Sequence, residues 1–91
     1  MESVSVISSP KTAIVALDPT RSSLLASLRE EPGSAATLAK RRGMPRQRVN
    51  YHLRELESHG LVELVEERRR RGMVERIMRP SAASYLVSPA A

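Results

Sequence analysis

Hydrophobic residues recur at helical spacing from residue 18 onward, and the first such stretch predicts a helix with defined ends. Asp18 can cap free backbone N–H groups, and Pro19 suits the first helical position because its missing donor is not needed there. Leu24 and Leu28 then fall on one face of the helix. The Glu-Pro-Gly run at residues 31–33 ends it.

Two further helices are predicted, separated by a short turn. Ser34 can cap the first of them, and Gly43 can end it in the left-handed conformation. The other runs over about residues 46–59 and ends at Gly60. Its inner face consists of Val49, His52, Leu53 and Leu56. The opposite face is polar and basic, so this helix is amphipathic.

After the third helix the pattern becomes β-prone. Residues 61–66 and 73–78 are two apolar-rich runs, and the charged loop 67–72 between them ends in glycine. This predicts a β-hairpin with an arginine-rich tip, in which Glu63, Glu66 and Glu67 pair with arginines across the hairpin. Pro80 ends the second strand. The fold expected for residues 13–80 is therefore mainly α with a small β-hairpin, a winged helix-turn-helix.

The two ends of the chain show weaker patterns. Residues 1–12 are rich in Ser and Val and contain Pro10, and we interpret them as a flexible N-terminal arm. Residues 81–91 are small and polar, and a short helix around 82–87 fits their composition. This C-terminal segment is a candidate dimer contact.

Composition narrows the class of protein. The 91 residues allow one small domain, and 41 % hydrophobic with 27 % charged residues indicates a globular chain. The absence of cysteine excludes disulfides, thiolate catalysis and cysteine-based metal sites. No catalytic motif is present, so we expect no enzyme, metal or cofactor. The N-terminus lacks the basic region of a signal peptide, and no apolar run is long enough to cross a membrane, which predicts a cytoplasmic protein.

Charge is segregated along the chain, whose net charge is +5. Residues 40–54 hold six cations and no acid, residues 55–67 hold five acids and no lysine or arginine, and residues 68–79 hold six arginines against one acid. Two basic blocks of this kind predict two contact elements on a polyanion. The alternative is a solvated surface with local ion pairs.

This pattern favours double-stranded DNA as the polyanionic partner. The major groove of DNA admits one helix, and the N-terminal part of that helix reaches base edges. Arginine can grip guanine, and asparagine or glutamine can grip adenine. The candidate base-reading residues are Arg46, Gln47, Arg48, Asn50, Tyr51 and Arg54. The candidates for the DNA backbone are Arg41 and Arg42 and, in a wing at 67–73 that would reach backbone or minor groove, Arg68, Arg69, Arg70 and Arg71.

Two motifs resemble the ArsR-type family of bacterial regulators. Residues 15–21 read Val-Ala-Leu-Asp-Pro-Thr-Arg and are similar to that family's opening Ala-Leu-x-Asp-Pro-Thr-Arg. Residues 49–57 and 60–62 resemble its recognition helix, Val-Ser-x-His-Leu-x-x-Leu-x-x-x-Gly-Leu-Val. The resemblance implies a homodimeric regulator, most often a repressor released by an effector, on a near-palindromic operator.

The chain also departs from that family. The helix at 35–42 lacks the cysteines with which many relatives sense metals, and no long C-terminal helix is available for the second common metal site. No effector is therefore indicated. Dimer contacts would fall to residues 6–17 and 81–88, unless the chain is the DNA-binding part of a longer regulator.

Two alternative interpretations require neither DNA nor a metal ion. The scaffold could serve as a protein-interaction module, but such a surface needs apolar anchors, and the outer face of residues 46–54 offers a single tyrosine. His52 is interpreted as a packed, hydrogen-bonded residue, and His59 as a helix-end residue that interacts with the helix dipole. Seven helical residues separate the two by about 10 Å, which is too far for them to share one zinc ion.

Overall fold

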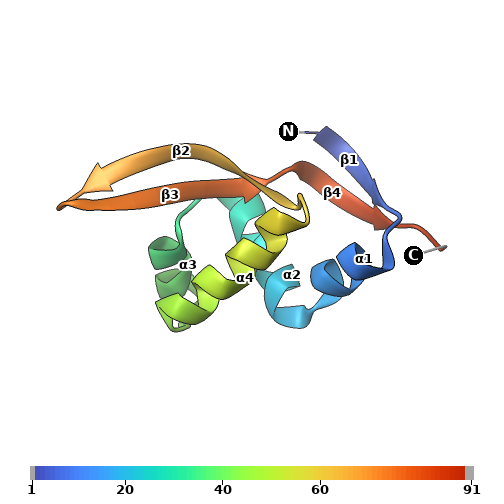
Figure 1. Ribbon diagram of the computed structural model, residues 1–91, viewed down its shortest axis with the longest axis horizontal. Coiled ribbons are helices and arrows are strands. Elements are labelled where there is room, and N and C mark those ends of the chain that lie inside the picture. The colour runs from blue at the N-terminus through green and yellow to red at the C-terminus, as the bar shows by residue number, and fades with distance from the viewer. Residues whose placement is uncertain (1, 90–91) are drawn as a thin grey trace.

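Residues 2–89 are described by the computed structural model, and they form four helices and four strands (Figure 1). In chain order these are β1 (Glu2–Ile7), α1 (Pro10–Leu17), α2 (Pro19–Glu30), α3 (Ala35–Arg42), α4 (Arg46–Ser58), β2 (Val62–Arg70), β3 (Met73–Pro80) and β4 (Ala82–Val87). Figure 1 shows the helices together, with the antiparallel β2·β3 hairpin above α3 and α4 and the parallel β1·β4 pair beside α1. The expected winged helix-turn-helix is confirmed.

Capping residues set the start of α2 and both ends of α3, two of the three predicted helices. Asp18 Oδ2 accepts a hydrogen bond from the Arg21 N–H at 3.0 Å, and Ser34 Oγ accepts one from the Thr37 N–H at 3.2 Å. Gly43 ends α3 with a φ of 62°, a left-handed conformation that favours glycine. The chain can therefore turn sharply between α3 and α4.

The hairpin is longer than the sequence predicts. The prediction of a loop over residues 67–72 is wrong, because β2 extends to Arg70 and β3 begins at Met73. Only Arg71 and Gly72 form the turn, with φ of 52° and 76°. Positive φ at both central residues matches the twist of two-residue hairpins. Three of the four consecutive arginines therefore lie on a strand rather than at a tip.

Gly33 fastens the hairpin to the helices. Its N–H donates to the Met78 carbonyl at 3.1 Å, and the Met78 N–H donates back to the Gly33 carbonyl at 2.9 Å. A Cβ atom at Gly33 would lie 3.3 Å from both Arg41 Nη2 and Thr37 Cγ2. The lack of a side chain therefore lets this connection between α2 and α3 pack closely.

Both chain ends differ from the expectation. Within the predicted arm at 1–12, Glu2–Ile7 is a strand, and α1 begins at Pro10 with Ser9 Oγ accepting from the Thr12 N–H at 3.4 Å. The predicted helix around 82–87 is also wrong, because this segment is β4 and pairs with β1. Pairing between distant segments overrides local helix preference here. Residue 1 of the arm and residues 90–91 of the C-terminal segment lie outside the described residues.

Aliphatic side chains from the helices form the core. Those with the least exposure are Leu24, Leu28, Leu38, Val49 and Leu56. Burial of a residue of this size contributes about 1.5–3 kcal/mol. The inner face of the β1·β4 pair adds Ile7, Tyr85 and Val87. The core thus holds the inner face of α4 and leaves the opposite face free.

Candidate nucleic-acid interface

Helix α4 presents a buried and an exposed face. Val49, Leu53 and Leu56 are buried, as the sequence predicts. The six candidate base-reading residues all lie on α4 and are all exposed; they are Arg46, Gln47, Arg48, Asn50, Tyr51 and Arg54. None of them is required for the core, so their polar groups are available to a ligand.

A groove of about 300 Å³ lies between α4 and the β2·β3 hairpin. Its walls come from α4, the start of α3 and β3. Four of the six candidates line it, namely Arg46, Gln47, Asn50 and Arg54. The structure therefore brings these four side chains together along the side of α4 that faces the hairpin.

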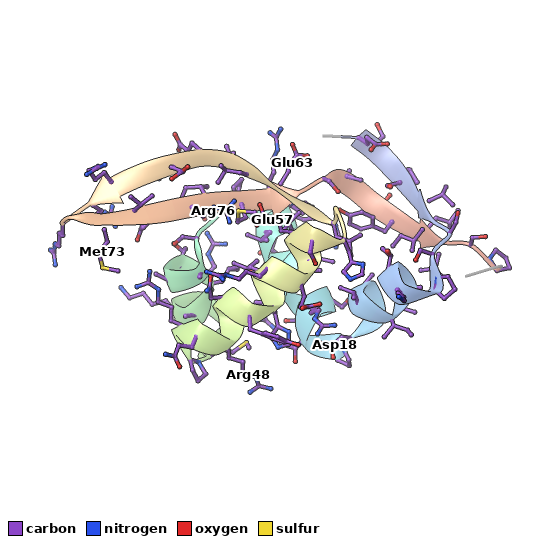
Figure 2. The ribbon with its side chains drawn as sticks, viewed as in Figure 1. Asp18, Arg48, Glu57, Glu63, Met73 and Arg76 are labelled. Carbon is purple, nitrogen blue, oxygen red and sulfur yellow. The ribbon has the colours of Figure 1, made fainter. Side chains whose placement is uncertain are left out.

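Arg48 and Tyr51 are not part of this groove lining. Figure 2 shows Arg48 pointing away from the hairpin, at the opposite side of the molecule. The Tyr51 ring is 56 % exposed and packs edge-on against the His52 ring, with centroids 5.3 Å apart. These two residues extend the exposed face of α4 beyond the groove.

Glu57 and Arg76 also line the groove, and the sequence did not single out either of them as a site residue. Arg76 Nη1 and Nη2 donate to Glu57 Oε1 and Oε2 at 2.9 and 2.7 Å (Figure 2). These hydrogen bonds hold the pKa of the Glu57 carboxyl below its usual value and raise the pKa of Arg76. The pair joins α4 to β3 and sets the distance between helix and hairpin. Nothing in the sequence signals it, because the partners lie on different elements.

The hairpin carries the arginine run. Arg68 pairs with Glu66 of its own strand, with its Nη2 2.6 Å from Oε1. Arg69, Arg70 and Arg71 are exposed, and no ion pair holds them among residues 2–89. Three arginines without an ion pair thus follow one another in sequence at the exposed end of the hairpin.

The acidic residues of β2 meet arginines in two ways. Glu63 forms the predicted pair across the hairpin, with Arg79 Nη2 3.3 Å from its Oε2. Glu67 lies opposite Arg76 in the strand register. Glu66 differs from the prediction, because its partner Arg68 lies on the same strand. These pairs leave the arginines nearest the turn as the unneutralised ones.

Arg41 and Arg42 at the end of α3 differ in their surroundings. Arg41 Nη1 donates to the Glu31 carbonyl at 2.9 Å, and its Nη2 lies 3.4 Å from Glu31 Oε2. Arg41 is thus held against the end of α2. Arg42 is exposed and has no such ion pair in the described part of the chain. Only Arg42 keeps its charge free for another partner.

Both histidines are held in hydrogen bonds, which the sequence predicts only for His52. Arg21 Nε donates to His52 Nδ1 at 3.1 Å, and Thr12 Oγ1 lies 3.3 Å from His59 Nδ1. Burial and the positive charge of Arg21 lower the pKa of His52. Across residues 2–89 no group of His, Asp and Glu side chains is arranged to hold a metal ion.

Comparison with known proteins places this geometry in a family. Residues 16–65 match the family described as "Helix-turn-helix domain". The chain belongs to this helix-turn-helix family. A solved structure is also similar: the homodimeric winged helix-turn-helix DNA-binding domain (fragment 1-100) of Mb0332 from Mycobacterium bovis, a possible ArsR-family transcriptional regulator. The TM-score is 0.63 at 22 % identity, over 79 % of this chain and 62 % of that one. No curated protein matches.

The helix-turn-helix match agrees with the resemblance to ArsR-type regulators that the sequence indicated. The matched residues include α2, α3 and α4 and end at the start of β2. Within this helix-turn-helix, α4 is the helix with the exposed polar face, and the hairpin stands beside it as the wing. Among residues 2–89, no helix combines the length and apolar character needed to cross a bilayer.

Proposed function

We propose that this protein is a transcriptional regulator that binds double-stranded DNA sequence-specifically as a homodimer. The observation that carries the proposal is the groove between α4 and the wing, because it collects four exposed polar and basic side chains beside the unpaired arginines of the wing. Major-groove recognition requires such side chains on an exposed helix. The family match supports the same function.

Helix α4 reads base edges in this proposal. The most direct readers are Arg46, Gln47, Asn50 and Arg54, with Arg48 and Tyr51 beside them. Arg and Asn form bidentate contacts with guanine and adenine, respectively, and each good contact discriminates by about 1–3 kcal/mol. Arg42 contacts the phosphate backbone at the start of α4. Arg41 is the weakest candidate for this role, because it is already bound to Glu31.

The wing binds DNA without reading its sequence. Arg69, Arg70 and Arg71 are exposed and unpaired among the described residues, so they can neutralise phosphates or enter a narrow minor groove. Arg68 can contact phosphates in the same way when its ion pair with Glu66 breaks. The positive charge that these arginines concentrate at the end of the wing favours a polyanionic partner.

Dimerisation uses the surface formed by α1 and the β1·β4 pair. Ile14 and Leu17 of α1 are 71 % and 64 % exposed, and Val4, Val6 and Leu86 of the β1·β4 pair are 54 %, 59 % and 61 % exposed. Exposed apolar side chains gathered at one end of a small domain favour a protein partner. The similar Mb0332 domain is homodimeric. Two copies would place their α4 helices about 34 Å apart on a near-palindromic operator.

We further propose that the protein is a cytoplasmic repressor of transcription. This part of the proposal rests on the resemblance to ArsR-type regulators. A regulator bound across a promoter blocks polymerase. Transcription in vitro from a promoter that overlaps the bound sequence should therefore fall on addition of the protein, whereas a promoter with a scrambled site should be unaffected. Increased transcription would reverse the proposed sign of regulation.

The test of DNA recognition is selection of bound duplexes from a random library at near-physiological salt. A two-fold symmetric motif is expected and would support both sequence reading and a dimer. Salt-sensitive binding without a motif would contradict sequence specificity. No binding at all would favour the protein-interaction module instead. Glu30→Gln is the control, because it changes one exposed charge on α2, outside α4, the wing and the surface proposed for dimerisation.

A further inference from the structure

A second hollow lies away from the groove beside α4. Its volume is about 460 Å³, within the range of small-molecule sites. It lies between the end of α2 and the junction of β3 with β4, and its lining consists of Leu28, Arg29, Pro32, Arg79, Pro80 and Ala83. It shares no lining residue with the groove beside α4. A ligand here would therefore not occupy the proposed DNA surface.

Two arginines and no acidic residue are among the residues that line this hollow. Arg29 comes from α2, where its guanidinium lies 5.9 Å from the centre of the Tyr85 ring. Arg79 comes from β3, and its only ion pair within residues 2–89 is the 3.3 Å contact of Nη2 with Glu63. Its Nε atom is buried without a hydrogen-bond partner in the described residues. The hollow thus offers positive charge, whereas the buried Nε of Arg79 is closed to a ligand.

The remaining lining is apolar. Leu28 and Pro80 are almost completely buried, and Pro32 and Ala83 are exposed at the rim. An inorganic anion would bind the two arginines and leave the apolar part of the lining in contact with water. A molecule with one anionic head and an apolar body would use both, because guanidinium binds carboxylate in a forked geometry while the body displaces water from the apolar wall.

We propose that this hollow binds a small organic acid, with its carboxylate between Arg29 and Arg79 and its apolar body against the exposed Pro32 and Ala83. The site is independent of DNA binding, so it stands or falls separately from the function proposed above. It gives the domain a ligand site without metal-binding residues. Its place at the β3–β4 junction puts the ligand between the wing and the surface proposed for dimerisation.

The test is an NMR titration of the full chain with 2-naphthoate, which joins one carboxylate to an apolar ring system. Saturable shifts are expected for the backbone amides of Leu28, Arg79 and Ala83. The neutral 2-naphthamide and inorganic phosphate should each bind at least tenfold more weakly. Absence of saturation with 2-naphthoate would overturn the proposal. Equal binding of the amide would overturn the role of the arginines, and equal binding of phosphate the role of the apolar wall.

Variants locate the binding. Arg29→Gln and Arg79→Gln should each weaken 2-naphthoate binding at least fivefold, whereas the charge-matched Lys11→Gln should leave it unchanged. Ala83→Leu should also weaken it, because it fills an exposed part of the hollow without altering charge. If Arg79→Gln does not fold, Arg29→Gln and Ala83→Leu still decide the question. Unchanged affinity in both of these folded variants would place the ligand elsewhere and contradict the proposal.

Discussion

Arg76 on the wing binds both carboxylate oxygens of Glu57 on α4, at 2.9 and 2.7 Å. The two residues are nineteen positions apart in sequence. This bidentate pair fixes the angle at which the wing stands over the helix, and the groove proposed for DNA lies beside it. A fork between guanidinium and carboxylate restrains orientation as well as distance.

Glu57→Gln should therefore destabilise the domain in a pH-dependent way. The side chains of Arg76 and Glu57 are 47 % and 34 % exposed, so solvent screening limits the expected loss in free energy of unfolding to about 0.5–1 kcal/mol at pH 7. Arg76 lowers the pKa of Glu57 from its ordinary 4.5. The stabilisation is then present above about pH 4.5 and lost as the pH falls through the folded-state pKa.

Urea unfolding at pH 7, 5 and 3 measures this effect. The difference between wild type and Glu57→Gln should shrink as the pH falls below 5. Glu30→Gln is the control, because Glu30 is exposed and has no ion pair in the part of the chain that the structure describes. An equal loss of stability at pH 7 and pH 3 would show that the charge pair is not responsible.

Asn50→Ala and Arg70→Ala should have different effects on DNA binding. Asn50 lines the groove on α4, so its loss should weaken binding to the selected motif by about 1–3 kcal/mol and relax base preference at one position. Arg70 is exposed on the wing, so its loss should weaken binding to all sequences alike and lower the salt slope by about one.

Fluorescence anisotropy with the selected duplex and a scrambled duplex, at several salt concentrations, separates the two effects. Glu30→Gln, on α2 and outside the surfaces proposed for DNA binding and dimerisation, should match the wild type on both duplexes. If Asn50→Ala weakens both duplexes equally, α4 does not read bases through this residue. If Arg70→Ala leaves the salt slope unchanged, the wing does not contact phosphates through this residue.

The parts of the fold that depend on neighbours in sequence could be predicted. The ends of α2 and α3 follow from Asp18, Ser34 and Gly43, because each acts within three or four residues of itself. The buried face of α4 follows from helical periodicity, and the exposed face is its complement. For the same reason, all six candidate base-reading residues could be predicted to lie on the exposed side of one helix.

The parts that depend on distant contacts could not be predicted. Strands β1 and β4 pair across the whole chain, with Val6 opposite Leu86, so neither segment shows a strong pattern alone. The Ser9-Pro10 start of α1 is a local signal that the arm interpretation overlooked. Glu57 and Arg76 meet only because the wing folds over α4.

His52 should make stability rise with pH through the weakly acidic range. Arg21 donates to Nδ1 of His52, which requires an unprotonated Nδ1, and burial together with the charge of Arg21 lowers the pKa of His52 below 6.5. The unfolded chain then binds the proton more readily, so stability is lost as the pH falls below about 6.5, until the folded-state pKa is passed.

An NMR titration should place the midpoint of His52 below 6.5, and the change in unfolding free energy between pH 7 and pH 5.5 should be smaller in His52→Gln. The histidine control is His59→Gln, which leaves the contact between Arg21 and His52 in place and should keep the pH dependence. A His52 midpoint at or above 6.5 would contradict the assigned role of Arg21.

Tyr85→Phe should destabilise the domain, because the Tyr85 hydroxyl organises the corner between β3 and β4. It donates to the Leu61 carbonyl and accepts from the backbone N–H groups of Ser81 and Ala82 at 3.1 and 3.3 Å. Ala82 is completely buried, so water cannot easily replace the lost partner. Unsatisfied groups of this kind cost about 1–3 kcal/mol each, and we expect a total loss of about 1–2 kcal/mol.

Tyr51→Phe is the matched control, since it removes the same hydroxyl from a side chain that is 56 % exposed on α4. Its effect on stability should stay within about 0.5 kcal/mol, as for most surface substitutions. Thermal and urea unfolding of the two variants compare one chemical change in two environments. Equal stability of the two variants would mean that the hydroxyl of Tyr85 does not hold the corner, and that ring packing alone anchors β4 to the core.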